Sequence, residues 1–454
     1  MSSVLELAER AVRAARGDEV EAVVQSERSG LARFAGSEVH QPTLVENVVV
    51  QLRVVRDGKV GVAVGNRISD DGLADLARRA GEAADSAPAD PDFPGLAPPS
   101  ALPNVSGYDE ETAGLSPEEQ ARRAAAAIEA AGDFDVYGYF TSGVTELAVA
   151  SSAGVAAEQA MTDAEILVLA AVDGASGYAE RCSRAVRDVD PAAAAREAAA
   201  KAARTREAVE IELGRYRAVL EPYAFAELLQ VFAYTAFGAL ALLEERSCLV
   251  GRLGEQLVDP KVSIADDALD PRGLPKAFDF EGSPKQRVEL IEQGVARGVV
   301  WDRATAARAA DGHATTGHAV PAHLQPYGPL PYALSVAGGE AGALDQLVEA
   351  VGEGIYITRV HYLGIVNPRE GVLTGMTRDG TFRIRDGRVA EPLANLRFTV
   401  AVPELLADVP ALTREVTLVS QSDFYDERYP TGVLVPALAT ASFNITGAGS
   451  GPGI

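Results

Sequence analysis

The chain has 454 residues, of which 47% are hydrophobic and 23% charged, as in ordinary globular proteins and unlike disordered chains. Its formal net charge of −24 at pH 7 argues against direct binding to nucleic acid, which needs clustered lysine and arginine. The two cysteines, Cys182 and Cys248, offer no disulfide framework, and the charged N-terminal stretch does not read as a signal peptide. We therefore expect a cytoplasmic protein of two or three domains.

The first part of the chain predicts two similar α+β units. Residues 1–86 read as a helix, strands at 20–26, 31–35 and 47–64 with a hairpin turn at Asp57-Gly58, and a second helix. A proline-rich connector at 87–115 leads to residues 116–208, where helix, strands, a turn at Asp173-Gly174 and helix recur in the same order; the strands include 135–141 and 145–151. We interpret these units as a duplicated layer of helices on an antiparallel sheet, with chance agreement of two generic patterns as the alternative.

Residues 209–454 predict a third domain built around one helix at 222–244. Pro222 suits the first turn, and the helix is almost wholly apolar after Val231, as in a buried helix. Its unbroken apolar part, roughly a dozen residues, is too short to cross a bilayer. Short strands and Asp-Gly turns follow, including a meander at 371–389. The fold class is thus α+β, with a mostly antiparallel, barrel-like C-terminal domain around a central buried helix.

A polar stripe interrupts this apolar helix. Glu227, Gln230 and Tyr234 follow the spacing i, i+3, i+7 and share one face. The stripe is either a partly exposed seam near the helix start or the lining of a cleft.

Four of the five histidines lie between 313 and 361. His313, His318 and His323 stand five residues apart in a loop with glycine and proline, a spacing that does not share one helix face. A loop can still gather imidazoles on a metal, and the alternative is a surface or cleft loop with incidental histidines. On a predicted strand at 354–363, Tyr356 and Tyr362 share one face and His361 takes the other. These three are candidates for a groove wall, with core packing as the alternative.

Several long stretches resemble the TldD/PmbA family. They are SCLVGRLGEQLVDPKVSIADD (247–267), HYLGIVNPREGVLTGMTRDGTFRIRDGRV (361–389) and PTGVLVPALATASFNITG (430–447), and the resemblance covers nearly the whole chain. It implies a heterodimeric metallopeptidase in which the catalytic TldD-type subunit holds zinc through a helical HExxxH motif and a downstream cysteine. The TldE/PmbA-type subunit lacks these ligands. The resemblance also implies that the loop at 313–323 corresponds to one beside the active site.

The chain departs from the catalytic pattern at both places. Where the resemblance puts HExxxH, residues 226–235 read AELLQVFAYT, and no histidine lies between His40 and His313. The last cysteine is Cys248, and the loop where the other ligand falls reads FYDERYPTG. Zinc catalysis needs about three protein ligands and an open position for water. We therefore expect no metal in this chain and zinc in a TldD-like partner.

The resulting hypothesis is a non-catalytic TldE/PmbA-like subunit that binds a TldD-like chain and an extended, unfolded peptide, without direct nucleic-acid or membrane contacts. Two rivals stay open. One is a stand-alone metal-dependent peptidase that uses the histidines of 313–323. The other is a binding or regulatory protein of the gyrase-modulator type with no peptidase role. The candidate residues for the peptide channel are Glu227, Gln230, Tyr234, His318, Tyr356 and His361.

Overall fold

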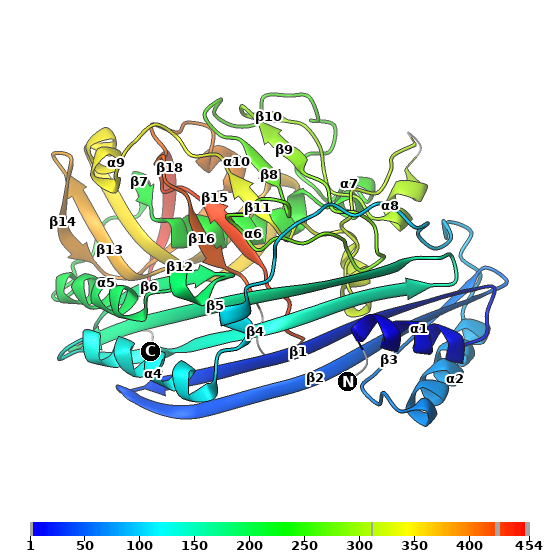
Figure 1. The fold of residues 1–454 in the computed structure, drawn as a ribbon. Helices are drawn as coiled ribbons and strands as arrows, with labels where there is room; N and C mark the ends of the chain where they lie inside the picture. The colour runs from blue at the N-terminus through cyan, green and yellow to red at the C-terminus, as the bar shows by residue number, and fades with distance from the viewer. Residues whose placement is uncertain (1–2, 310–311, 423–426, 450–454) are drawn as a thin grey trace.

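A long, curved antiparallel sheet of six strands forms the base of the molecule (Figure 1). The computed structural model describes residues 3–309, 312–422 and 427–449. The sheet has the order β3-β2-β1-β4-β5-β6, and the strands are β1 (Glu19–Ala35), β2 (Glu38–Arg56), β3 (Lys59–Gly65), β4 (Asp135–Ser151), β5 (Ala156–Val172) and β6 (Ala175–Ser183).

Two predicted breaks in these strands are wrong. The segments 20–26 and 31–35 belong to the single strand β1, and 135–141 and 145–151 belong to β4. Gly30 stays in the strand because it pairs with Leu44 on one side and Ser142 on the other. Two paired neighbours outweigh the weak strand propensity of glycine.

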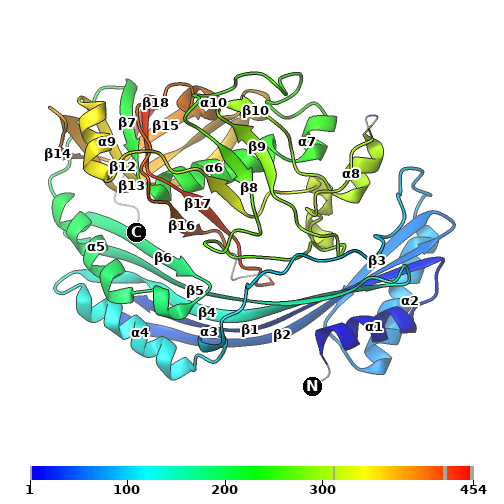
Figure 2. The ribbon, with the colours of Figure 1, turned by 45° about the horizontal axis from the view of Figure 1, so that its top comes forward.

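Helices cover one face of this sheet, and the C-terminal half of the chain covers the other (Figure 2). The helices are α1 (Val4–Ala14), α2 (Asp70–Ser86), α4 (Pro117–Ala130) and α5 (Pro191–Arg204), while the connector at 87–115 holds only the short α3 (Glu110–Ala113). Side chains alternate along each strand, so Val24, Ile166 and Val168 pack in the helix-side clusters. The opposite, inner face carries many polar residues.

Each half of the sheet repeats the order helix, three strands, helix, and the halves join where β1 pairs with β4. The hairpins turn at Asp57-Gly58 and Asp173-Gly174, as predicted; all four residues have positive φ. A second glycine follows each turn by three residues. A Cβ on Gly61 would lie 2.1 Å from the backbone nitrogen of Ala84 in α2. A Cβ on Gly177 would lie 2.2 Å from the backbone oxygen of Ala198 in α5.

Gly61→Ala and Gly177→Ala should therefore each lower the free energy of unfolding by about 1–3 kcal/mol, because the helix must move away from the strand. Urea denaturation of each variant measures this. Gly364→Ala is the control, since its Cβ would meet nothing closer than 3.6 Å. Equal stability of all three variants would contradict the close helix–strand contact.

The C-terminal half contains two further six-stranded sheets. One has the order β12-β7-β18-β15-β13-β14, and because β13 also pairs with β12, this row of strands bends back on itself. Its strands are β7 (Gly214–Leu220), β12 (Gly354–Asn367), β13 (Val372–Arg385), β14 (Arg388–Leu393), β15 (Leu396–Ala401) and β18 (Leu438–Ala448). The other has the order β10-β9-β8-β11-β17-β16, with β8 (Ile264–Asp266), β9 (Val288–Glu292), β10 (Val295–Ala296), β11 (Leu334–Val336), β16 (Thr417–Ser420) and β17 (Gly432–Val435). The predicted α+β class is confirmed.

The helix α6 (Pro222–Ala236) lies in the core of this half, and most of its side chains are buried. The predicted end at residue 244 is wrong, because the helix stops before Gly238 and the separate α7 (Ala239–Leu243) follows. At the break, the backbones of Phe237 and Ala239 hydrogen-bond Val300 at 2.8 and 3.0 Å. Glycine is a weak helix former, so this pairing interrupts the helix. The remaining short helices are α8 (Arg303–Arg308), α9 (Leu344–Val351) and α10 (Val402–Leu405).

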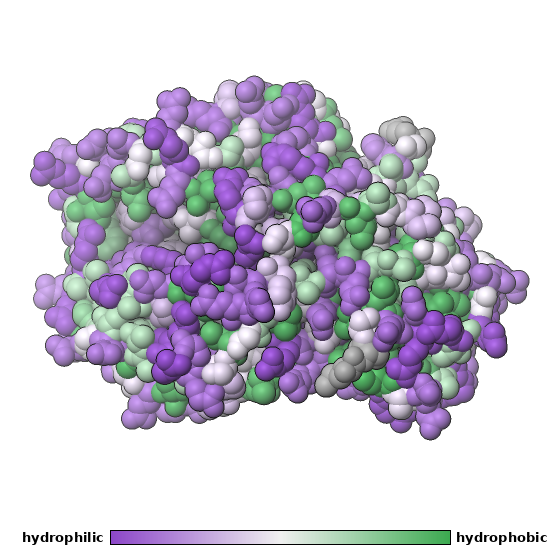
Figure 3. Space-filling model, viewed as in Figure 1, coloured by the Kyte–Doolittle hydropathy of each residue, from purple (hydrophilic) through white to green (hydrophobic). Residues whose placement is uncertain are grey.

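The face of the molecule in Figure 3 is largely hydrophilic, with hydrophobic residues scattered over it. None of the helices in the described ranges has both the length and the apolar character needed to cross a bilayer.

Candidate functional site

Three hollows follow one another between the inner face of the long sheet and the C-terminal half. The acidic cavity, about 390 Å³, is lined by Glu165, Glu180 and Glu227 among others. The tyrosine cavity, about 250 Å³, is lined by Tyr234, Tyr332 and Tyr429 among others. The outer cavity, about 390 Å³, is lined by Val23, Gln51 and Val64 among others. Gln421 lines the first two, while Gln25, Phe280, Pro321, His323 and Glu427 line the last two. The three hollows together form one groove.

The pairing register of the strands shows which residues form the floor of the acidic cavity. Residues opposite one another on adjacent strands point to the same face of a sheet. One row across the sheet is Arg33, Tyr139, Leu167 and Glu180, from β1, β4, β5 and β6. The next row on this face is Leu31, Thr141, Glu165 and Cys182. The sheet thus presents two glutamates from neighbouring strands toward α6.

These glutamates are almost completely buried. Tyr139 donates a hydrogen bond to Glu165 Oε1 at 2.6 Å, and Glu165 Oε2 has no hydrogen-bond partner. Burial first, and then the nearby charge of Glu180, raise the pKa of Glu165 to about 8. Glu180 accepts hydrogen bonds from the Tyr178 hydroxyl and, at 3.0 Å, from the backbone N–H of Ser420. Burial raises the pKa of Glu180 as well, because it disfavours the charged form.

The stripe predicted on α6 divides between two hollows. Glu227 lines the acidic cavity, and Tyr234, 40% exposed, lines the tyrosine cavity. Gln230 is buried and lines none of the three hollows. Burial raises the pKa of Glu227, and the charge of Arg359 and a hydrogen bond with Gln421 oppose that rise. Two of the three stripe residues therefore face the groove.

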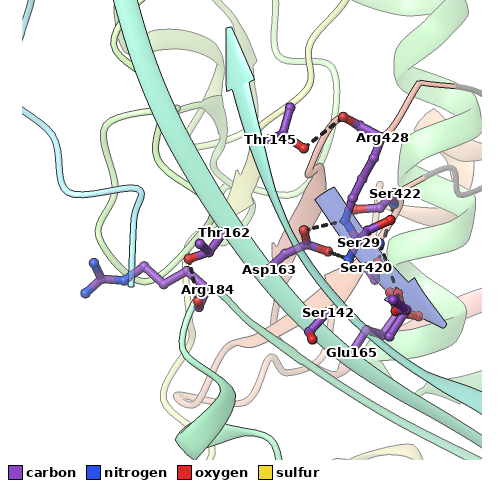
Figure 4. Close-up of polar contacts among 12 residues, drawn as sticks. Ser29, Ser142, Thr145, Thr162, Asp163, Glu165, Arg184, Ser420, Ser422 and Arg428 are labelled. Atoms are coloured by element: carbon purple, nitrogen blue, oxygen red, sulfur yellow. Dashed lines mark hydrogen bonds and ion pairs between the residues drawn. The ribbon is translucent and has the colours of Figure 1, made fainter. Parts of the chain in front are cut away.

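Arg428 ties the C-terminal half to the inner face of the sheet (Figure 4). Its guanidinium donates to both oxygens of Asp163, at 2.9 and 2.6 Å, and to the Thr141 hydroxyl at 3.0 Å. Its backbone oxygen accepts from Gln25 and from Thr145, at 2.9 and 3.0 Å. The residue is 1% exposed. A bidentate arginine–carboxylate pair is a strong contact when both groups are buried.

Sequence reasoning missed Arg428. It lies in the stretch FYDERYPTG, whose informative feature in the sequence is the lack of a cysteine; residues 423–426 lie outside the described ranges. The available signal was on β5, where Asp163 and Glu165 alternate with apolar residues. Charges at every second position of a strand normally indicate a solvent face, and only the tertiary contact shows that they are covered.

The three histidines at 313–323 do not converge. The exposed His313 ring stacks on Trp301 with centroids 4.1 Å apart. His318 is fully buried, with Nε2 2.9 Å from Asp266 Oδ1 and Nδ1 2.9 Å from Thr316 Oγ1. Both ring nitrogens of His318 are thus engaged, and burial lowers its pKa. His323 lines the outer and tyrosine cavities. Of the three, only His323 faces the groove, so His318 as a groove residue is a prediction that the geometry does not favour.

The candidates on β12 also lie away from the three hollows. The Tyr356 hydroxyl donates to Glu221 Oε1 at 2.7 Å, and its ring packs against Phe382. The predicted opposite placement of His361 and Tyr362 is wrong, because their rings lie together with centroids 4.3 Å apart. Tyr362 has a φ of 54°, and the pairing with β13 shifts there, so the alternation of faces breaks. Tyr362 is 73% exposed.

A zinc ion in a protein is held by three or four converging side chains. Across 3–309, 312–422 and 427–449, no three histidine, cysteine, aspartate or glutamate side chains gather as a metal site would require. In the stretch at 226–235 of α6, Glu227 is the one residue of these types. The described side chains therefore do not fit a catalytic zinc.

Models of two metallopeptidase domains match most of this chain. Residues 213–447 match the PmbA/TldA metallopeptidase C-terminal domain, and residues 20–84 match PmbA/TldA metallopeptidase domain 1. The chain belongs to the PmbA/TldD family. It is 29% identical over 233 residues to a metalloprotease from Methanothermobacter thermautotrophicus, a match that covers 48% of this chain and 47% of that protein. A match of 35% identity to an uncharacterized protein from Methanocaldococcus jannaschii covers 91 residues, 20% of this chain and 22% of that protein.

Solved structures share the fold over nearly the whole chain. TldE from Thermococcus kodakarensis is 20% identical, with a TM-score of 0.86 over 98% of this chain and 100% of that one. A protein from Thermotoga maritima described as a modulator of DNA gyrase is also 20% identical, with a TM-score of 0.84 and the same coverage. A protein of the same description from Bacteroides thetaiotaomicron is 18% identical, with a TM-score of 0.81 over 97% and 98%. At these identities the likeness establishes the fold alone.

Proposed function

We propose that this chain is the non-catalytic, TldE/PmbA-like subunit of a heterodimeric zinc peptidase that acts on unfolded peptides. The zinc would lie in a TldD-like partner, and this chain would complete the peptide channel. The observation that carries the proposal is α6: at the place of the family's metal helix, the stretch at 226–235 directs Glu227 toward the groove and offers no histidine.

The groove suits an extended peptide. β16 is the last strand of its sheet, and its residues Val419 and Ser420 line the acidic cavity. The outer backbone groups of β16, apart from the Ser420 N–H that donates to Glu180, can pair with an extended chain that adds as a further strand. Such a groove favours unfolded over folded substrates because a single extended chain fits where a globular surface does not.

The test compares the isolated chain with the same chain co-expressed with a TldD-like protein that carries HExxxH. The isolated chain should retain no stoichiometric zinc after dialysis and should not cleave an unfolded peptide. The pair should co-elute in size-exclusion chromatography with light scattering, bind zinc and cleave the peptide. We expect the two chains to associate through an interface that buries more than ~2,000 Å², as in obligate complexes. One zinc per isolated chain with chelator-sensitive cleavage would instead establish a stand-alone peptidase. Two separate peaks at micromolar concentration would favour a regulatory protein without a peptidase partner.

Glu227→Ala tests the role of the groove in that complex. Because Glu227 lines a cavity, its loss should change the free energy of unfolding by no more than ~0.5 kcal/mol. Removing a groove hydrogen-bonding group should change kcat/KM for an unfolded peptide by about 2–10-fold. The control is Glu255→Ala in an exposed turn. A sharp fall in melting temperature with unchanged activity per folded complex would assign Glu227 a structural role instead.

A further inference from the structure

The acidic cavity holds more carboxylate than its cations balance. Glu165, Glu180 and Glu227 line it, and within the described part of the chain none of them forms a salt bridge. Two arginines, Arg33 and Arg359, also line the cavity, against three glutamates, and of these Arg359 is already engaged by another carboxylate, as is the nearby Arg428. Arg359 lies 3.1 Å from Asp379 Oδ2, and Arg428 forms its bidentate pair with Asp163.

One carboxylate oxygen in this cavity lacks a partner. Glu165 is 2% exposed; the Tyr139 and Ser420 hydroxyls lie against its carboxyl, yet no donor meets its Oε2 with hydrogen-bond geometry. A buried acceptor without a donor is destabilising unless a ligand or water supplies one. Glu165 lies on the inner face, in the row with Thr141 and Cys182, and its side chain lines the cavity.

The walls of the cavity also suit a positive charge. Tyr178 and Tyr223 line it, and their rings meet edge to face with centroids 5.3 Å apart. Tyrosine faces attract cations, and one already does so here, since Arg359 lies 4.1 Å from the Tyr178 ring centroid. Carboxylates and tyrosines together form a surface with many acceptors and few free donors.

The arrangement favours a molecular cation over a metal ion. The described carboxylates do not gather into a three-ligand group, so they cannot surround one small ion. A primary ammonium group needs only one or two carboxylates, because hydroxyl oxygens and an aromatic face can serve its remaining N–H donors. We propose that the acidic cavity binds a primary ammonium group, carried by a lysine side chain or by the α-amino terminus of a peptide. This proposal rests on the proposed function in one respect, namely that the molecule carrying the ammonium group is a peptide.

Binding should also release protons. The titratable and charged groups that line the cavity with Glu165 are Arg33 on β1, Tyr139 on β4, Tyr178 and Glu180 on β6, Tyr223 and Glu227 on α6, and Arg359 on β12. Asp163, Cys182 and Arg428 lie beside it. Burial raises the pKa of Glu165 to about 8, so this carboxyl holds a proton near neutral pH, and burial raises the pKa of Glu180 as well. A bound ammonium group favours their charged forms and displaces the protons.

The experiment is isothermal titration calorimetry on the isolated full-length chain with three glycine-serine hexapeptides. The first is N-acetylated with one internal lysine, the second is N-acetylated with norleucine at that position, and the third has a free N-terminus and no lysine. The first or the third should bind about tenfold more tightly than the norleucine peptide, since a charge-assisted hydrogen bond contributes about 1.5–3 kcal/mol. Tighter binding of the first identifies lysine as the source, and tighter binding of the third identifies the α-amino group. Titrations in phosphate and in Tris, which differ in ionisation enthalpy, should show proton release.

Glu165→Gln with Glu180→Gln should abolish both the preference and the proton release, while Glu158→Gln, exposed on the same strand β5, should keep both. Circular dichroism checks that the double variant is folded. Proton release by the wild-type chain is a second readout, which does not depend on the folding of the variant. Equal binding of all three peptides, or an unchanged preference in the double variant, would overturn the proposal. If the complex with a TldD-like partner is inactive but the isolated chain still prefers the peptide that carries the ammonium group, the proposed function is wrong and the ammonium site is supported.

Discussion

Replacing Arg428 with methionine should lower the free energy of unfolding by about 3–5 kcal/mol, because the change leaves the Asp163 carboxylate buried without its cation. Asp163 has 0% of its surface exposed, so solvent cannot replace the lost donors. The Thr141 hydroxyl also loses a partner. Urea denaturation, followed by the fluorescence of the single tryptophan Trp301, measures the loss.

A second substitution separates charge from packing. Arg428→Met with Asp163→Leu removes both charges, and this pair should recover a large part of the lost stability, since replacing a whole buried ion pair by apolar groups is often neutral. Arg388→Met, at an exposed position of β14, serves as the control and should stay within ~0.5 kcal/mol of the wild type. A single variant as stable as the control would mean that the Arg428 contact does not hold the two halves together.

Glu165→Gln should make the protein progressively more stable than the wild type as the pH rises from about 5 to about 8. The ordinary pKa of the carboxyl is 4.5, and in the folded chain burial and the charge of Glu180 raise it to about 8. Between these values the folded state holds a proton that the unfolded state has released. The stabilisation from this group is therefore complete below the unfolded pKa and is lost as the pH rises through the folded pKa.

Each pKa unit corresponds to about 1.4 kcal/mol, so the difference between the two proteins should change by several kcal/mol across this window. Urea midpoints of wild type and variant, measured at the same pH values, give the difference. Other buried groups with shifted pKa values, such as Lys276 and Glu281, are present in both proteins and cancel in the subtraction. Glu158→Gln is the control and should give a flat difference. A flat result for Glu165→Gln as well would mean that this carboxyl titrates like an exposed one.

Local sequence determined much of the N-terminal half and the identity of the central helix. The Asp57-Gly58 and Asp173-Gly174 pairs specified the hairpins because few other residues adopt positive φ at both turn positions. The apolar run after Pro222 specified a buried helix, and the spacing of Glu227 and Tyr234 placed both on one face of it; the tertiary structure turns these two side chains toward the groove. The absence of histidine at 226–235 was also evident from the residues alone.

Tertiary structure decided where the elements end and which polar residues meet. The helix stops before Gly238 because Val300, distant in the sequence, pairs with the backbone there. Tyr362 breaks the alternation of β12 through a local bulge, so His361 and Tyr362 touch. The acidic cavity joins Glu165 and Glu180 from neighbouring strands with Glu227 from α6. Alternation along a strand defines two faces but does not show which is covered by the rest of the chain, and the partners of a buried charge depend on that covering.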